Sequence, residues 1–197
     1  MVGLAIVAIL GGLAVPSVNT LVRDYNLRSA ADDLVFAANF ARGQAAANRR
    51  AYGLILPPAG SPAGLTFSVR AGTTAACSSV AGGTEVLASN YAAGNALGKD
   101  VVVVTARAPV ETSTQAAFAC FRPDGRVVRG DNLRAFSAPS GGTLFSGDVI
   151  LELQRWGGTG VIGTPLQVQI SYNGTARITY GRPLSELQGS GNGGGAE

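Results

Sequence analysis

The sequence contains no histidine and few of the residues that hold metals or carry out covalent catalysis. Without histidine, the Ser-His and Cys-His arrangements of nucleophilic catalysis are excluded, as is the most common protein ligand of transition metals. Two cysteines among 197 residues are too few for an all-cysteine zinc site or an iron–sulfur cluster. Lys99 is the single lysine. We therefore expect no enzyme activity, no cofactor and no bound metal.

Charge is also scarce in this sequence. Charged residues make up 14% of the chain, and the net charge of +3 is not concentrated in any one segment. The nearest acidic pairs are Asp32 with Asp33, inside a helical pattern, and Asp124 with Asp131, beside a turn. Both pairs are interpreted as solvated surface. A membrane-anchored enzyme and a small-molecule substrate are therefore not expected.

The longest hydrophobic run stands at the start of the sequence. It is unbroken for the 15 residues from Met1 to Val15, and apolar residues continue it past Pro16 as far as Val22. A bilayer core needs about 20 apolar residues in a helix, so residues 1–22 are long enough to span it. Proline is tolerated in such a helix because neighbouring helices satisfy the freed carbonyl, and we predict a kink at Pro16.

Two alternatives compete for this apolar run. A secretory signal peptide requires a basic segment before the run and a small-residue cleavage site, and neither is visible in the sequence. An ordinary buried helix leaves the spanning length of the run unexplained. The sequence therefore favours a membrane or filament helix.

From Arg23 to Arg50 the pattern becomes amphipathic. Apolar residues recur at steps of three and four, while charged residues lie mostly on other faces. A continuous helix over residues 1–50 would be about 75 Å long, well beyond the usual globular length, so half of it must lie in lipid or among similar helices. The stripe predicted to pack on a core consists of Leu27, Ala30, Ala31, Leu34, Ala38, Ala41 and Ala45.

The segments MVGLAIVAILGGLAVPS, LRSAADDL and ARGQAAANRR together resemble the N-terminal helix of type IV pilin-like proteins, and more closely the FimT, FimU and GspH minor pilins and pseudopilins. The resemblance implies a bacterial single-pass inner-membrane protein with a periplasmic head, which later enters a pilus or pseudopilus filament. It implies other pilins or pseudopilins and the inner-membrane assembly platform as partners. Family precursors carry a basic leader, a cleavage-site glycine and an early glutamate, and none of these precedes Met1. N-terminal processing and methylation therefore have no residues to act on in this sequence.

The sequence after residue 50 is typical of a β-rich head, because short apolar runs alternate with turns. We expect about eight strands, mostly antiparallel. The β-branched run Val101–Ala106 predicts a central strand buried on both faces. Residues 72–98 are expected to form a long loop with one weak strand at 85–88. The other expected strands are Ala51–Leu56, Leu65–Val69, Ala116–Phe121, Arg126–Arg129, Asp148–Trp156, Leu166–Ser171 and Ala176–Tyr180.

Two turns and one alternating strand give the head its local detail. Pro123-Asp124-Gly125 has proline and glycine where turn geometry favours them, and Asn173-Gly174 is a strong hairpin pattern. In Asp148–Trp156, apolar residues alternate with a second set that we expect to face solvent. That second set is Ile150, Glu152 and Gln154.

Cys77 and Cys120 form an even count behind a predicted membrane anchor. An even count suggests export to an oxidising compartment and one disulfide between them. Two unrelated buried thiols are the alternative.

The predicted fold class is therefore α+β, a long N-terminal hydrophobic helix packed on a mostly antiparallel sheet or β-sandwich head. This is the pilin architecture, and the segment FRPDGRVV over Phe121–Val128 resembles the turn of the GspH and FimT family. We divide the chain into a membrane or filament half of the helix at 1–22, an amphipathic half at 23–50, a head at 51–188 and a disordered glycine-rich tail at 189–197.

The resemblance implies a structural subunit, at the tip or in the priming complex of a type IV pilus or of a type II secretion pseudopilus. Small residues favour close packing of helices in lipid or in a filament, and Gly3, Ala8, Gly11 and Gly12 supply them. A plain membrane span would account for the same residues.

A FimT-like minor pilin that binds DNA during uptake is the alternative function. In that group a Gly-Arg-x-Arg turn is thought to contact phosphates. Here the corresponding hairpin reads Gly174-Thr175-Ala176-Arg177 and lacks the first arginine, so the candidate DNA or partner contacts are Arg122, Arg126, Arg129 and Arg177, with Arg134 nearby in sequence.

Overall fold

The structure is a computed structural model of the chain. It describes the backbone over residues 2–56, 64–92, 101–108, 118–130, 143–144, 149–171 and 173–179. Side-chain environments are described over residues 24–56, 64–92, 101–105, 119–128, 149–171 and 173–179. The predicted glycine-rich tail at 189–197 lies outside the described residues.

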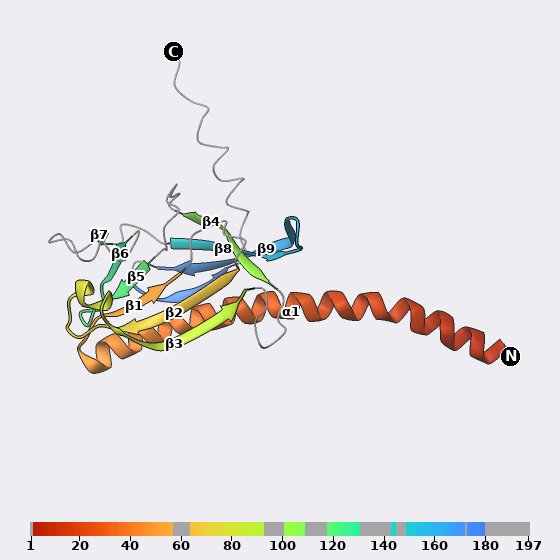
Figure 1. Cartoon of the computed structure of the whole chain (residues 1–197), viewed down its shortest axis with the longest axis horizontal. Helices are drawn as coiled ribbons and strands as arrows, with labels where there is room; N and C mark the ends of the chain where they lie inside the picture. The colour runs from red at the N-terminus through yellow and green to blue at the C-terminus, as the bar shows by residue number, and fades with distance from the viewer. Residues whose placement is uncertain are drawn as a thin grey trace, which may run out of the picture.

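The first element is a single long helix, α1 (Val2–Asn48), of 47 residues. At about 1.5 Å per residue it is about 70 Å long. Figure 1 shows its C-terminal half lying along the β-rich head and its N-terminal half projecting away from it. The predicted stripe is confirmed, because all seven of its residues from Leu27 to Ala45 are buried in the main core.

Ten strands and one short 3-10 helix are described after the helix. They form a six-stranded sheet in the order β3-β2-β1-β5-β6-β7 and a four-stranded sheet in the order β10-β9-β8-β4. Neighbouring strands are antiparallel throughout. The elements are β1 (Tyr52–Ile55), β2 (Leu65–Ala71), η1 (Cys77–Val80), β3 (Thr84–Tyr91), β4 (Val102–Ala108), β5 (Phe118–Phe121), β6 (Val127–Gly130), β7 (Thr143–Leu144), β8 (Val149–Trp156), β9 (Val161–Ile170) and β10 (Ala176–Thr179).

The helix packs on strands of both sheets, so the α+β class is confirmed. The sheets do not form a clear sandwich, because each of them turns a face to α1 rather than only to the other sheet. Alanines dominate the helix side of this contact, with Ala37, Ala38, Ala41 and Ala45 fully buried. Small side chains let the helix backbone approach the sheets closely, and the larger side chains of the strands fill the space.

Polar contacts fix the helix on both flanks of the apolar stripe. On one flank, the Tyr91 hydroxyl at the end of β3 donates a hydrogen bond to the Asp33 carboxylate. On the other, the Asn39 amide bonds to the backbone of Ala176 in β10, donating at 3.3 Å and accepting at 3.2 Å. The interpretation of Asp33 as solvated surface is therefore wrong, because the flank of this stripe faces the end of β3.

Three expectations about the strands need correction. The run Val102–Val104 is buried, but β4 lies at the edge of the four-stranded sheet rather than at its centre. Burial on both faces of a strand depends on what packs above and below the sheet. It does not show whether the strand is central or at the edge. In residues 72–98, expected to be a loop, the strand at 85–88 is confirmed but is longer, because it is part of the eight-residue β3 paired with β2, and the region also contains η1. The Arg126–Arg129 strand begins one residue later, at Val127.

The alternation in β8 is correct for the core face and wrong for the opposite face. Leu151 and Leu153 are fully buried in the core. Glu152, expected to face solvent, is buried as well, together with its cross-strand neighbour Gln167. The Gln167 amide donates to the Glu152 carboxylate at 3.4 Å, and the Thr105 hydroxyl donates to the Glu152 carbonyl at 3.1 Å. These hydrogen bonds compensate the desolvation of the polar groups.

Candidate functional site

The projecting half of α1 is the first candidate site. Its backbone is helical without interruption from Val2, through Pro16, to the part that packs on the head. The side chains predicted to pack in lipid or in a filament lie outside the described residues: Gly3, Ala8, Gly11 and Gly12. In the part of the chain described in full, no helix is both long and apolar enough to cross a membrane. The predicted span at 1–22 is outside that part, and the kink at Pro16 stays a prediction.

The solvent face of the packed half of α1 carries aromatic side chains. Tyr25 is 72% exposed and Phe36 is 59% exposed, although both lie on a helix that is well packed on its opposite side. Phe36 stacks on Phe40 one turn later, with ring centroids 5.9 Å apart. Exposed aromatic residues in one row are more typical of a surface that contacts a partner than of a solvated helix face.

The disulfide between Cys77 and Cys120 is confirmed. It joins η1 to β5 across a sequence separation of 43 residues, with the two Cα atoms 5.9 Å apart. Both cysteines are buried in a small second core with Ala51, Val80 and Val128. The bond therefore fixes η1 over the face of the six-stranded sheet that is turned away from the helix.

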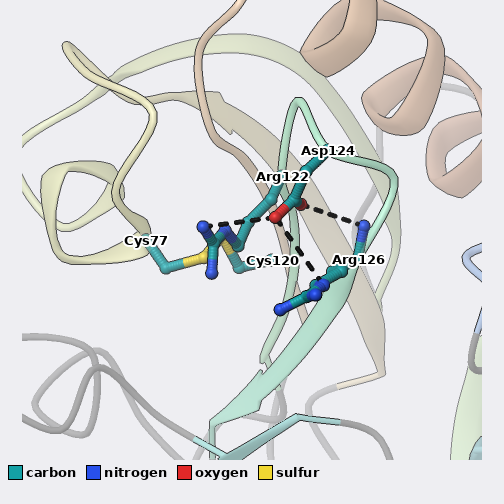
Figure 2. Close-up of polar contacts among 5 residues, drawn as sticks. All are labelled: Cys77, Cys120, Arg122, Asp124 and Arg126. Atoms are coloured by element: carbon teal, nitrogen blue, oxygen red, sulfur yellow. Dashed lines mark hydrogen bonds and ion pairs between the residues drawn. A yellow bond between two sulfur atoms is a disulfide. The ribbon is translucent and has the colours of Figure 1, made fainter.

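The arginine-containing turn between β5 and β6 is built around Asp124. Figure 2 shows Arg122 and Arg126 on either side of this carboxylate, next to the disulfide. Asp124 Oδ2 lies 3.3 Å from Arg122 Nη2 and 3.8 Å from Arg126 Nε. Its Oδ1 accepts the backbone N–H of Arg126 at 3.2 Å. One carboxylate thus offsets part of the charge of two arginines and orders the turn between them.

The β9–β10 turn lies beside the β5–β6 turn. A Cβ atom at Gly174 would approach Val127 Cγ2 to 2.9 Å and Phe121 Cδ1 to 3.3 Å. The turns therefore touch, but Arg177 is held on its own hairpin, where its Nε donates to Gln169 Oε1 at 3.0 Å. The side chains of Arg129 and Arg134 lie outside the described residues. Of the candidate arginines, Arg122 and Arg126 thus lie together at one turn, and Arg177 lies on the other hairpin.

A shallow depression on the outer face of β1, β2 and β3 has a volume of about 430 Å³. Its lining is mixed, with apolar Ile55 and Phe67 beside small polar side chains and one carboxylate, Glu85. Among the described residues, no group of three acidic or cysteine side chains lies together as a metal site requires.

No protein-family model matches the chain, and no curated protein is detectably similar to it. Among solved structures, it is similar to the type IV minor pilin FimU of Pseudomonas aeruginosa in two crystal forms. The first has 17% sequence identity, covers 80% of this chain and 90% of that chain, and gives a TM-score of 0.41. The second has 18% identity, covers 78% and 93% of the two chains, and gives a TM-score of 0.39. No function is carried over from these similarities.

Sequence reasoning missed the contacts where the projecting half of α1 meets the head. Arg155 Nη1 lies 3.4 Å from Asp24 Oδ1 and ties the end of β8 to the helix. No sequence pattern relates two residues 131 positions apart. An exposed pair of β-branched residues, Val161 and Ile162, lies on the adjoining hairpin. The absence of charge between Trp156 and Ala176 is the sequence feature that could have drawn attention to this hairpin.

Proposed function

We propose that the chain is a structural subunit of a type IV pilus or of a type II secretion pseudopilus, acting in its tip or priming complex. The observation that carries the proposal is the division of one continuous helix into two halves. Residues from Leu27 to Ala45 pack on the head, whereas the preceding apolar half projects from it (Figure 1). Such a helix is unexpected in a soluble domain, because leaving about 20 apolar residues in water is unfavourable.

The projecting half of the helix suits two environments in succession. In the inner membrane it would span the bilayer and leave the head in the periplasm. In the filament it would pack among equivalent helices of other subunits, where Gly3, Ala8, Gly11 and Gly12 permit close approach. The disulfide supports an oxidising compartment for the head. The exposed Tyr25 and Phe36 provide further contact surface on the same helix, with Phe36 stacked on the partly buried Phe40.

DNA capture receives less support from the geometry. Phosphate binding depends on arginines whose charge is available, and Asp124 lies within 3.8 Å of both Arg122 and Arg126. Arg177 is hydrogen-bonded to Gln169 instead of joining that turn. We therefore expect the head to attract DNA only as weakly as other mildly basic proteins do.

Cysteine cross-linking in the native cell envelope tests the proposed function. Both natural cysteines are in the disulfide, so an added cysteine is the sole free thiol. We expect Ala8→Cys, in the apolar half of the helix, to form disulfides with cysteines placed at the same depth in other filament subunits. Ala47→Cys, on the exposed last turn of the same helix, is the matched control and should cross-link less. Failure of Ala8→Cys to capture any filament subunit, while the protein is present in the envelope, would rule out the proposed packing.

A further inference from the structure

The end of the head from which α1 projects carries a hairpin tip that has no charged residue beyond Arg155. Its last two rungs pair Arg155 with Ile162 and Trp156 with Val161. The turn is closed by a hydrogen bond from Gly157 N–H to the Gly160 carbonyl at 2.7 Å. Figure 1 shows this β8–β9 tip at the end of the head nearest the projecting helix.

The tip is apolar and open to solvent. Val161 is 45% exposed and Ile162 is 41% exposed, and residues 157–159 and 163–164 beside them are exposed as well. No charged residue occurs from Trp156 through Ala176. Exposed hairpins and strand edges usually carry charged side chains that prevent association. Here residues 156–164 carry none, and the Arg155 side chain is 11% exposed and paired with Asp24. The tip is therefore suited to contact with an apolar or interfacial surface.

An ion pair shows where the tip lies along the helix axis. Arg155 Nη1 lies 3.4 Å from Asp24 Oδ1. Asp24 follows Val22, the end of the apolar run, by about 3 Å of helix rise. The exposed Tyr25 lies at the same level on the solvent face of the helix. The end of the apolar helix, Tyr25 and the hairpin tip thus lie at one depth, on different sides of the axis.

We propose that this rim, defined as Tyr25, Trp156, Val161 and Ile162, rests in the interfacial region of the lipid bilayer while the subunit is anchored in the membrane before assembly. A membrane surface is a plane, so residues around the axis at one depth meet it together. Tyrosine and tryptophan favour the headgroup level because their rings are apolar and their N–H or O–H groups remain hydrated. The inference rests on the proposed function, since it requires residues 1–22 to span the bilayer.

The rim would orient the head as well as strengthen the attachment of the subunit to the membrane. Two contacts on different sides of the helix, Tyr25 and the hairpin tip, restrict rotation and tilt of the head relative to the membrane. Release of the rim would then accompany extraction of the subunit into the filament.

Tryptophan fluorescence tests this contact directly, because Trp156 is the single tryptophan of the chain and lies in the rim. The full chain is reconstituted into phosphatidylcholine–phosphatidylglycerol vesicles that contain lipids brominated either near the headgroup or near the chain end. We expect stronger quenching by the shallow bromines than by the deep ones, and protection from aqueous acrylamide relative to the detergent-solubilised protein. Val161→Ser combined with Ile162→Ser should abolish most of the shallow quenching. Val86→Ser, at a β3 valine that is 46% exposed, is the matched control and should leave it unchanged.

Vesicle flotation separates failure of the rim contact from failure of the anchor. If the protein floats with the vesicles but Trp156 stays open to acrylamide and unquenched by lipid, the rim contact is wrong and the anchor stands. If the protein does not float, both are wrong. Protection of Trp156 that depends on protein concentration and not on brominated lipid would assign the rim to a second copy of the chain and overturn the membrane contact.

Discussion

At the scale of single residues, Gly174 shows how closely the β9–β10 turn packs on the strands beside the β5–β6 turn. Its φ is +81°, which favours glycine, and its backbone lies so close to Val127 that an added Cβ would come within 2.9 Å of the Cγ2 atom. Gly125, in the neighbouring turn, has a similar φ of +79° but open space around it. The two glycines therefore separate the effect of backbone conformation from the effect of close packing.

We expect Gly174→Ala to destabilise the head more than Gly125→Ala does. A left-handed alanine costs about 1–2 kcal/mol at either position, and displacement of Val127 adds about 1–3 kcal/mol at Gly174 alone. Urea unfolding of both variants measures the difference. Equal losses of stability would show that the two turns do not press against each other.

The disulfide makes a second prediction at the residue scale. Replacing Cys77 and Cys120 together by serine should lower the free energy of unfolding by up to about 4 kcal/mol, because the closed loop of the unfolded chain is released. The two serines would also lie in a small apolar core. Thermal unfolding with and without reductant checks the effect, and a reductant that leaves the stability of the natural protein unchanged would contradict it.

Some of these single-residue features could be predicted from the sequence, and others could not. The cysteine pair and the Asn173-Gly174 hairpin could be read from composition and turn chemistry, because both depend on local rules or on a count of two. The burial of Glu152 could not be predicted. Alternation along β8 shows which face of the sheet a side chain lies on, but not whether other residues cover that face. The shared carboxylate of Asp124 likewise depends on the arrangement of the turn in space.

At the scale of elements, the long helix is the feature that periodicity predicted best. Steps of three and four residues identify the buried stripe because helix geometry places such residues on one face. Sheet order was predicted poorly, since the valine run of β4 is buried yet lies at an edge. A hydrophobic run indicates that a strand is buried, whereas the order of strands in a sheet depends on pairing between distant segments.

Two large side chains on the same helix test its packing. Leu34→Ala should lower the free energy of unfolding by about 2–5 kcal/mol, because it leaves a cavity between the helix and the sheets. Phe36→Ala, on the solvent face, should cost less than about 1 kcal/mol. Chemical denaturation of the head measures both, and the reverse order would mean that the helix docks through its other face.

At the scale of the whole molecule, one helix serves both as part of the head and as an extension beyond it. The head holds the C-terminal half through alanine packing, Tyr91–Asp33 and Asn39–Ala176 contacts, and the disulfide stabilises a separate part of the same head. In the proposed filament, a projecting helix attached this firmly would transmit force and position from one subunit to the next. This property is what a filament subunit requires of its fold.

Removal of residues 1–22 tests this account most directly. The truncated protein, exported behind a cleavable secretion signal, is compared with the full chain in membranes washed with high salt and in sheared filaments, by quantitative mass spectrometry. We expect the full chain in both fractions and the truncated head, still folded and disulfide-bonded, in neither. A truncated head that stays with membranes or filaments at the level of the full chain would contradict the role assigned to the projecting helix.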